Sequence, residues 1–217
     1  MSSTTDRHAA DRQAVDHQAV VIDSGIGNLG NLARALRHVG AECTITRDPD
    51  VVSAGRCLVL PGVGAFKPPR ETVRGALEEA IHTALDNGAW LLGICVGYQL
   101  LFDASTEFGT TDGLGLLPGT VDHLPEGVSL PHIGWNPLVD VADHPLLRHI
   151  DPGAHMYFVH SFAPLEVGDG VALARARHGA SFVAVAGRGR VFGTQFHPEK
   201  SGQHGLQLLR NFLEMAN

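Results

Sequence analysis

One stretch of the chain decides its fold: residues 90–102, which read WLLGICVGYQLLF. An apolar run ends at Cys95, glycines stand two residues before and two residues after this cysteine, and the pattern then becomes helical. This order is typical of a buried strand, a sharp turn and a helix, with Cys95 on the turn. A side chain at such a turn is exposed at the carboxyl edge of a sheet, where glycines let neighbouring backbone pass closely.

Cys95 therefore stands where a nucleophile is expected. The helix after it would direct its amino terminus at the sulfur, which favours the thiolate and could hold an oxyanion. A free cysteine is more usually a small buried hydrophobe, however, and the pentapeptide at residues 93–97 fits both interpretations. The choice depends on the groups that the rest of the chain brings to Cys95.

Composition limits the classes of function open to the chain. Its 217 residues are enough for one α/β domain with a substantial core. A formal net charge of −7, with 16 Lys and Arg residues and no basic cluster, argues against a nucleic-acid partner. Only 3 cysteines are present, an odd count that fits a reducing compartment, so the cytoplasm is the expected location. No apolar run approaches the ~20 residues of a membrane span, and no membrane partner is expected.

Short apolar runs alternate with helical patterns in the first half of the chain. Strands are expected at residues 19–23, 42–46, 57–60 and 90–95, and helices at 29–39 and 71–87. This alternation predicts a parallel, doubly wound sheet. The second half should be more antiparallel, with strands at 156–162, 171–176, 182–186 and 191–196 before a closing helix at 205–215.

The amino-terminal residues 1–18 differ from the rest of the chain. They are polar and lack the apolar core of a signal peptide. We expect a disordered extension there, followed by a single domain at residues 19–217.

Three loops should meet at the carboxyl edge of the predicted sheet, beginning at Ser24, Pro61 and Cys95. Ligands of doubly wound sheets bind at this edge. Gly25 and Gly27 suggest dinucleotide binding, but the third glycine of that fingerprint is missing from its expected place. No cofactor is therefore expected.

A histidine oriented by a carboxylate is the usual partner of a cysteine nucleophile. His197 follows the strand predicted at 191–196, and reaches the same edge as Cys95 if the two strands are parallel. Pro198 fixes the backbone between His197 and Glu199, so the two side chains can project the same way. This grouping favours the nucleophile interpretation of Cys95.

Other histidines and cysteines compete for a role. His132 and His160 have no carboxylate close in sequence. No pair of histidines has the spacing of a zinc-binding helix and the cysteines are not paired, so no metal site is expected. Cys43 and Cys57 lie in or beside predicted strands, where buried apolar filling is their expected role.

Two segments carry a resemblance to a known family. Residues 93–99 (GICVGYQ) and 196–199 (FHPE) resemble the class I, or triad, glutamine amidotransferases. Residues 61–66 (PGVGAF), 131–136 (PHIGWN) and 25–29 (GIGNL) resemble, within that family, the glutaminase subunit of imidazole glycerol phosphate synthase from histidine biosynthesis. The resemblance runs from about residue 20 to the carboxyl terminus. Ser24 is a departure, because the family more often has an aromatic residue there.

The resemblance implies a flavodoxin-like fold, with a mostly parallel central sheet flanked by helices and an added antiparallel part. It also implies that Cys95 attacks the carboxamide of glutamine to form a thioester. His197 would protonate the departing ammonia and later activate water, while Glu199 orients His197. The resemblance also implies that the peptide at residues 63–64 flips to complete the oxyanion hole. The implied oxyanion-hole residues are Val63, Gly64 and Val96, and the implied substrate-binding residues are Gly62, Gln99, Ser161 and Phe162.

The resemblance further implies a partner, a (β/α)₈ cyclase subunit that receives the ammonia. The cyclase combines it with a phosphoribulosyl substrate to give imidazole glycerol phosphate and an aminoimidazole carboxamide nucleotide. The candidate residues for the interface of this heterodimer are Asn28, Trp135 and Lys200.

Three alternatives remain open on the sequence alone. The chain could be a glutaminase that serves another synthase, such as the one that makes pyridoxal phosphate. It could also be a non-catalytic regulatory domain of the same fold, or a cysteine hydrolase that acts on another amide.

Overall fold

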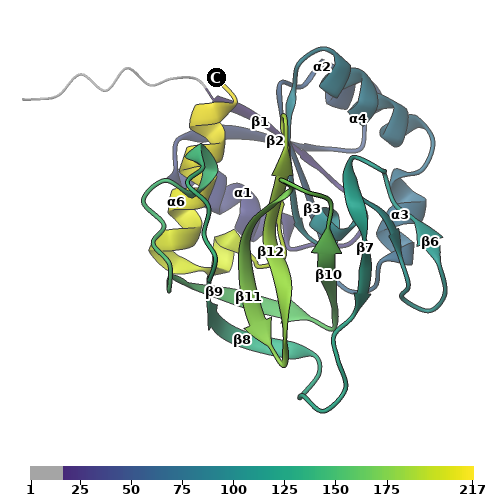
Figure 1. The fold of residues 1–217 in the computed structure, drawn as a ribbon. Coiled ribbons are helices and arrows are strands. Elements are labelled where there is room, and N and C mark those ends of the chain that lie inside the picture. Colours follow the sequence, from purple (N-terminus) through teal and green to yellow (C-terminus); the bar gives the residue numbers. More distant parts are fainter. Residues whose placement is uncertain (1–16) are drawn as a thin grey trace, which may run out of the picture.

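Seven strands form the central sheet in a computed structural model that describes residues 17–217 (Figure 1). Their order is β11-β12-β13-β4-β3-β1-β2. Their bounds are β1 (His17–Ile22), β2 (Ala41–Thr46), β3 (Cys57–Gly62), β4 (Trp90–Cys95), β11 (Ala172–His178), β12 (Ala180–Arg188) and β13 (Val191–Thr194). The strands from β13 to β2 are parallel, whereas β11 and β12 are antiparallel. The predicted α/β class with a mostly parallel sheet is confirmed.

The first strand begins earlier than predicted. His17 pairs with Ala41 and Gln18 pairs with Glu42, so both residues belong to the sheet. The remainder of the extension that we predicted over residues 1–18 lies outside the described residues.

Helices cover both faces of the central sheet. Their bounds are α1 (Leu29–His38), α2 (Pro49–Ala54), α3 (Lys67–Val73), α4 (Ala76–Asp86), α5 (Val96–Gln99) and α6 (Gly202–Met215). Helices α1 and α6 lie on one side of the sheet, and α2, α3 and α4 lie on the other (Figure 1). In the part of the chain that the structure describes, no helix is long and apolar enough to cross a membrane.

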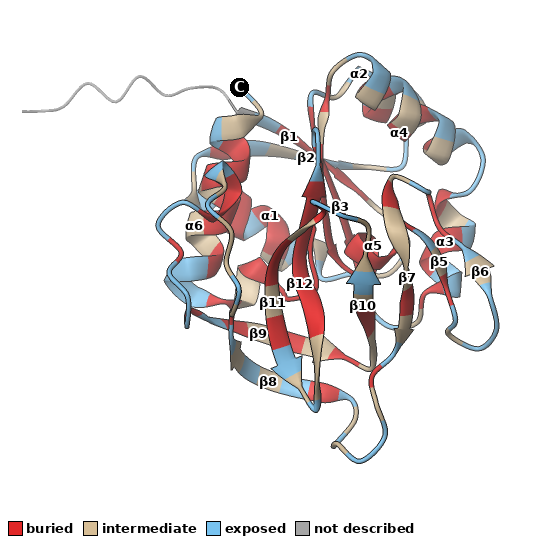
Figure 2. Cartoon of the chain, in the orientation of Figure 1, coloured by how far each residue is buried: buried red, intermediate tan, exposed pale blue. Residues whose placement is uncertain are grey.

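Alternate side chains of one strand supply the two halves of the core. Val21 shares a buried cluster with Leu36 and Phe212 of the α1 and α6 layer. Its neighbour Ile22 shares a second cluster with Val52 and Ile81 of the α2 and α4 layer. This period of two is expected for a strand buried on both faces, and buried residues dominate the inner strands of the sheet, such as β3 and β4, whereas the edge strand β2 is largely exposed (Figure 2).

Two smaller sheets extend the carboxyl half of the chain. One has the order β10-β7-β5-β6, formed by β5 (Phe102–Ser105), β6 (Thr111–Asp112), β7 (Leu117–His123) and β10 (Phe162–Val167). The other pairs β8 (His132–Pro137) with β9 (His155–His160). The strand predicted at 156–162 is thus two strands, because the chain leaves β9 at Ser161 and enters another sheet. Short 3-10 helices lie at η1 (Pro145–Leu147) and η2 (Pro198–Lys200).

One helix prediction was wrong in extent, and another predicted helix is short. The helix expected at 71–87 is broken between α3 and α4, because Gly75 has a φ of +84° that no regular helix contains. The helix expected after Cys95 has only four residues, and the chain turns into β5 at Phe102. Tyr98, Leu100 and Leu101 are all 0% exposed, so this segment has no solvent-facing side on which a longer surface helix could lie.

The turn between β4 and α5, residues 93–97, is pressed against β3, and we call it the elbow. A Cβ atom on Gly97 would overlap the carbonyl oxygen of Leu60, and one on Gly93 would lie 2.7 Å from the Cα of Tyr98. On the β3 side, a Cβ on Gly62 would lie 2.8 Å from the backbone nitrogen of Gly97. Backbone meets backbone here, so glycine is required on both sides.

This crowding leads to a stability prediction for a pair of glycines. Gly97→Ala should lower the free energy of unfolding by about 3 kcal/mol or more, because backbone has to move to admit the methyl group. Gly30→Ala is the matched control, since no atom lies within 4 Å of its added Cβ in α1. It should be neutral or stabilise the protein by up to ~1 kcal/mol. Urea denaturation of both variants tests the assignment, and equal midpoints would contradict it.

Candidate active site

Cys95 is held at the elbow in a strained backbone conformation. Its φ of +55° and ψ of −112° lie outside the regions that a residue with a side chain normally adopts. The residue is 2% exposed, and its sulfur lies 3.9 Å from the carbonyl oxygen of Val159 and 4.0 Å from the Nε2 of Gln195. Strain of this kind costs about 1–3 kcal/mol and is concentrated at functional sites.

His197 reaches the same edge because its strand is parallel to that of Cys95. In the register of β13 and β4, Gly193 pairs with Gly93 and Thr194 pairs with Ile94. His197 follows three residues after Thr194, and its backbone N–H donates to the carbonyl of Tyr157 at 2.9 Å. The hydroxyl of Ser201 donates to the His197 carbonyl at 2.6 Å, which holds the residue from its other end.

Glu199 is hydrogen-bonded to the Nδ1 of the His197 imidazole. Its Oε1 lies 2.9 Å from the Nδ1 of His197, and the two side chains are 4% and 3% exposed. A carboxylate can only accept at this distance, so Nδ1 carries the proton. The other ring nitrogen, Nε2, is buried and makes no hydrogen bond within residues 17–217, which leaves it available to a reacting group.

The surroundings of His197 favour its charged form. Burial alone would lower its pKa, but interactions with the Cys95 sulfur and the Glu199 carboxylate outweigh burial and raise the pKa to about 9. The imidazole can therefore be protonated at neutral pH, as a general acid beside a thiolate requires.

A cavity of about 250 Å³ opens in front of Cys95. The residues that line it come from five segments far apart in the sequence: Val63, Gly64, Cys95, Val96, Gln99, Glu107, Pro131, Val159, His160, Ser161 and Phe162. Six of the seven residues that the resemblance assigned to the oxyanion hole and to substrate binding are among them. The seventh, Gly62, pairs with Cys95 in the sheet instead. His197 and Glu199 do not line the cavity.

The loop at residues 61–66 borders the cavity and is held at both ends by side chains. The hydroxyl of Ser24, which is fully buried, donates to the Pro61 carbonyl at 2.9 Å. At the other end, the N–H of Phe66 donates to the Glu107 carboxylate at 2.7 Å. Gly64 lies between them with a φ of +81° and with no atom within 4 Å of an added Cβ.

Gln99 occupies the floor of the cavity. Its Nε2 donates to the Phe162 carbonyl at 2.8 Å and lies 3.2 Å from the Oε1 of Gln195. Both glutamines are buried, so these bonds satisfy groups that burial would otherwise penalise. The floor is therefore a hydrogen-bonded unit that includes the backbone after β9.

Sequence reasoning missed two residues of this site, Glu107 and Gln195. Gln195 could have been found, because it stands two residues before His197 in an extended segment and such residues share a face. Glu107 gave no comparable signal, since the loop after β5 approaches the cavity only through the tertiary fold. The buried role of Ser24 was likewise not predicted.

The candidate interface residues lie at the surface. Trp135 is 52% exposed and packs edge-on against the Tyr157 ring, with centroids 6.0 Å apart. The Nζ of Lys200 lies 5.5 Å from the centre of the same ring, so Trp135 and Lys200 both approach Tyr157. Asn28 is exposed at the start of α1, where its side chain accepts from the Asn31 N–H at 3.3 Å.

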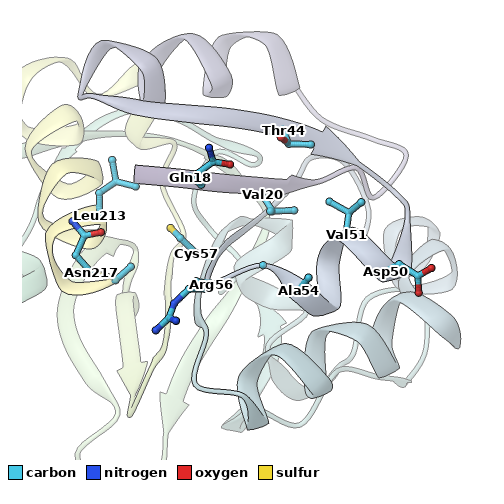
Figure 3. A pocket seen from close by; sticks show the side chains of 12 residues that line it. Gln18, Val20, Thr44, Asp50, Val51, Ala54, Arg56, Cys57, Leu213 and Asn217 are labelled. Atoms are coloured by element: carbon cyan, nitrogen blue, oxygen red, sulfur yellow. The ribbon is translucent and has the colours of Figure 1, made fainter. Parts of the chain in front are cut away.

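A larger cavity, of about 680 Å³, lies at the opposite end of the strands (Figure 3). The side chains around it come from the starts of β1 and β3, from β2, from α2 and from the end of the chain. Its one thiol belongs to Cys57, and burial raises the pKa of that thiol to about 12, so it is not a nucleophile at neutral pH. Within residues 17–217, no group of three His, Cys, Asp or Glu side chains is arranged to hold a metal ion.

Comparisons with known proteins agree with this geometry. The sequence model of the family "Glutamine amidotransferase class-I" matches residues 20–216. The chain is 43% identical to the imidazole glycerol phosphate synthase subunit HisH of Natronomonas pharaonis over 218 residues, which covers 97% of each chain. It is 44% identical to the subunit of the same name from Salinibacter ruber over 200 residues, covering 88% of this chain and 92% of the relative.

Solved structures show the same fold. A glutamine amidotransferase crystal structure aligns with a TM-score of 0.72 and 24% identity, covering 91% of this chain and 98% of that one. The PurLQS structure from Thermotoga maritima aligns with a TM-score of 0.73 and 22% identity, covering 92% and 99%.

The pairing of His197 with Glu199 leads to a titration prediction. In Glu199→Gln the neutral amide no longer stabilises the imidazolium, so the pKa of His197 should fall from about 9 by at least about one pH unit. An NMR titration of the His197 ring measures this fall. Glu126→Gln, at an exposed glutamate, is the matched control and should leave the titration unchanged. An unchanged His197 titration in Glu199→Gln would show that the carboxylate does not set the charge state.

Proposed function

The chain belongs to the class-I glutamine amidotransferase family, and we propose that it is the glutaminase subunit of imidazole glycerol phosphate synthase. It is an enzyme that hydrolyses glutamine to glutamate and ammonia. The observation that carries the assignment is the elbow, where a strained cysteine meets a buried histidine that a carboxylate orients. Curated relatives of about 43% identity over nearly the whole chain support the same function.

The first half of the reaction forms a thioester at Cys95. Its thiolate attacks the carboxamide carbon of glutamine, and the carbonyl electrons move onto oxygen in a tetrahedral intermediate. As this intermediate collapses, the C–N bond breaks and His197 gives its Nε2 proton to the departing ammonia. A pKa of about 9 keeps that proton on His197 at neutral pH.

The second half releases glutamate. The neutral His197 accepts a proton from water, whose oxygen attacks the thioester carbon. The C–S bond then breaks and returns the thiolate to Cys95. Glu199 keeps the imidazole in one orientation throughout, because its bond to Nδ1 is buried.

The oxyanion of both intermediates needs N–H donors beside Cys95. The N–H of Val96 follows the nucleophile directly, and the loop at residues 61–66 can supply a second donor at Val63 or Gly64. One such donor is typically worth about 3 kcal/mol of barrier. Gly64 can turn its peptide with little steric cost, since it has no side chain and no atom lies within 4 Å of the position that a Cβ would take.

The cavity suits a single free amino acid. Its volume of about 250 Å³ is below the roughly 300–1,000 Å³ of sites for drug-sized ligands. Glu107 supplies the one carboxylate among the lining residues, and we assign it to the α-ammonium group of glutamine. Gln99 and the backbone at Ser161 and Phe162 hold the remaining polar groups of the substrate.

The ammonia passes to a cyclase subunit, and we place that partner against the surface that carries Asn28, Trp135 and Lys200. Ile133 extends this surface, because it is 61% exposed and stands two residues from Trp135 on β8. Exposed large apolar side chains of this kind are typical of protein interfaces. We expect the complex to be a cytoplasmic heterodimer.

The proposed function predicts glutamine hydrolysis that depends on the partner. Ammonia release should be slow for the purified chain and should rise when the cyclase subunit and its nucleotide ligand are added. Cys95→Ala should lower turnover in the complex by at least about 10³-fold, because it removes the nucleophile. Strong hydrolysis that the partner does not change would contradict the assignment, and full turnover in Cys95→Ala would exclude the mechanism.

Glu107 gives a separate prediction about substrate binding. Glu107→Gln should raise the KM for glutamine about tenfold or more, since a hydrogen bond to a charged group is typically worth about 1.5–3 kcal/mol. Glu71→Gln is the matched control at an exposed glutamate and should leave KM unchanged. Equal KM values for both variants would remove Glu107 from the substrate site.

A further inference from the structure

Two histidines outside the triad form a pair between β8 and β9. His132 and His160 lie directly opposite one another in the register of these strands, and they are 2% and 6% exposed. The Nδ1 of His132 lies 3.0 Å from the Nε2 of His160. The proposed reaction uses neither ring, yet His160 lines the substrate cavity.

The hydrogen bonds determine which ring of this pair donates a proton and which ring accepts. The Nδ1 of His160 lies 3.0 Å from the Phe162 carbonyl, which can only accept, so this Nδ1 carries a proton. Burial and the neighbouring histidines lower the pKa of His160 to about 3, which leaves its ring neutral and its Nε2 free of a proton. That Nε2 must then accept from His132, whose Nδ1 therefore carries a proton too.

The Nε2 of His132, at the end of the pair farthest from Phe162, agrees with donation from His132 to His160. Burial lowers the pKa of His132, so its ring is also neutral and its Nε2 has only a lone pair. This Nε2 is buried without a hydrogen-bond partner in the described part of the chain. An unpaired lone pair is a smaller penalty there than an unpaired N–H would be.

The near end of the pair enters the substrate site at Phe162. The carbonyl oxygen of Phe162 accepts from His160 Nδ1 and also from Gln99 Nε2. Ser161 and Phe162 border the cavity, and the Leu124 N–H donates to the Ser161 carbonyl at 2.9 Å where β7 and β10 pair. The backbone thus holds Ser161, whereas the two side chains hold the Phe162 carbonyl.

We infer that His132 and His160 are positioning residues, which act through the Phe162 carbonyl to hold the wall that binds the amino-acid end of the substrate. The inference rests on the proposed function, because it takes glutamine as the ligand of the cavity. Neither histidine transfers a proton in the reaction. Their effect is on binding, with little effect on the chemical step.

Packing alone does not account for the pair. The two rings lie among Phe158, Phe182 and His178 with ring centroids 4.1–6.0 Å apart, so a phenylalanine could fill either place. A phenylalanine has no N–H to donate, however. The comparison of phenylalanine and asparagine variants therefore separates filling of space from donation to Phe162.

The test measures glutamine kinetics in the complex with the cyclase subunit. His160→Phe should raise KM about tenfold and change kcat less than twofold. His160→Asn can place an amide N–H near the former Nδ1, so it should restore KM to within about threefold of wild type. His178→Phe is the matched control, because that ring stacks on His132 with centroids 4.1 Å apart but donates to Ser129 instead. Unchanged KM in His160→Phe, or equal losses in all three variants, would overturn the inference.

If His160→Phe does not fold, a second variant and an NMR spectrum of the wild-type protein test the inference. His132→Phe should raise KM about threefold, because His160 then keeps its bond to Phe162 but loses the donor behind it. Independently of activity, ¹⁵N NMR of the wild-type histidines should show protons on Nδ1 of both His132 and His160. A proton on Nε2 of either ring would overturn the inference, whereas absence of ammonia release by the wild-type complex would count against the proposed function alone.

Discussion

The close approach of two backbones at the elbow is the constraint on which the rest of the site depends. The elbow packs against β3 so closely that glycine is needed at Gly62, Gly93 and Gly97. This contact fixes where β4 ends, and therefore where Cys95 adopts its positive φ. The loop after β3 is brought beside the sulfur by the same contact, because Gly62 pairs with Cys95 in the sheet. The proposed nucleophile and the proposed oxyanion donors thus share one structural cause.

The strain and the buried polar groups of the site are supported by an apolar sheet. A positive φ at Cys95 and an ion pair taken out of water at His197 and Glu199 each oppose folding. Both lie at the end of strands whose side chains are buried on two faces, between separate helix layers. The large core outweighs these local penalties, so the structure holds a reactive arrangement that the isolated segments could not maintain.

The sequence predicted the sheet and the contact between His197 and Glu199 better than it predicted the rest of the site, for a physical reason. Local pattern defines the parts that were predicted well. Apolar runs mark the strands at residues 57–60 and 90–95, and a proline fixes the turn that brings His197 and Glu199 together. The extent of α5 depends on burial from all sides, which periodicity does not report. Glu107 reaches the cavity only because β5 and β7 pair in a separate sheet. Contacts made by tertiary packing cannot be predicted from the local spacing of residues in the sequence.

The two walls of the cavity differ in how firmly they are held, and in the proposed function this difference separates substrate binding from catalysis. On the substrate side, the Phe162 carbonyl accepts from two buried side chains, so a shift there breaks two bonds together. On the proposed oxyanion side, the loop at residues 61–66 is tied at its ends by Ser24 and Glu107, while no atom lies within 4 Å of a Cβ added to Gly64 between them. In the proposed mechanism, a peptide in the middle of that loop rotates while the two ends stay tied. On the proposed function, the loop at residues 61–66 adjusts to complete the oxyanion hole, while the wall at Phe162 stays fixed. Glutamine can then bind to the fixed wall before its ammonia is released.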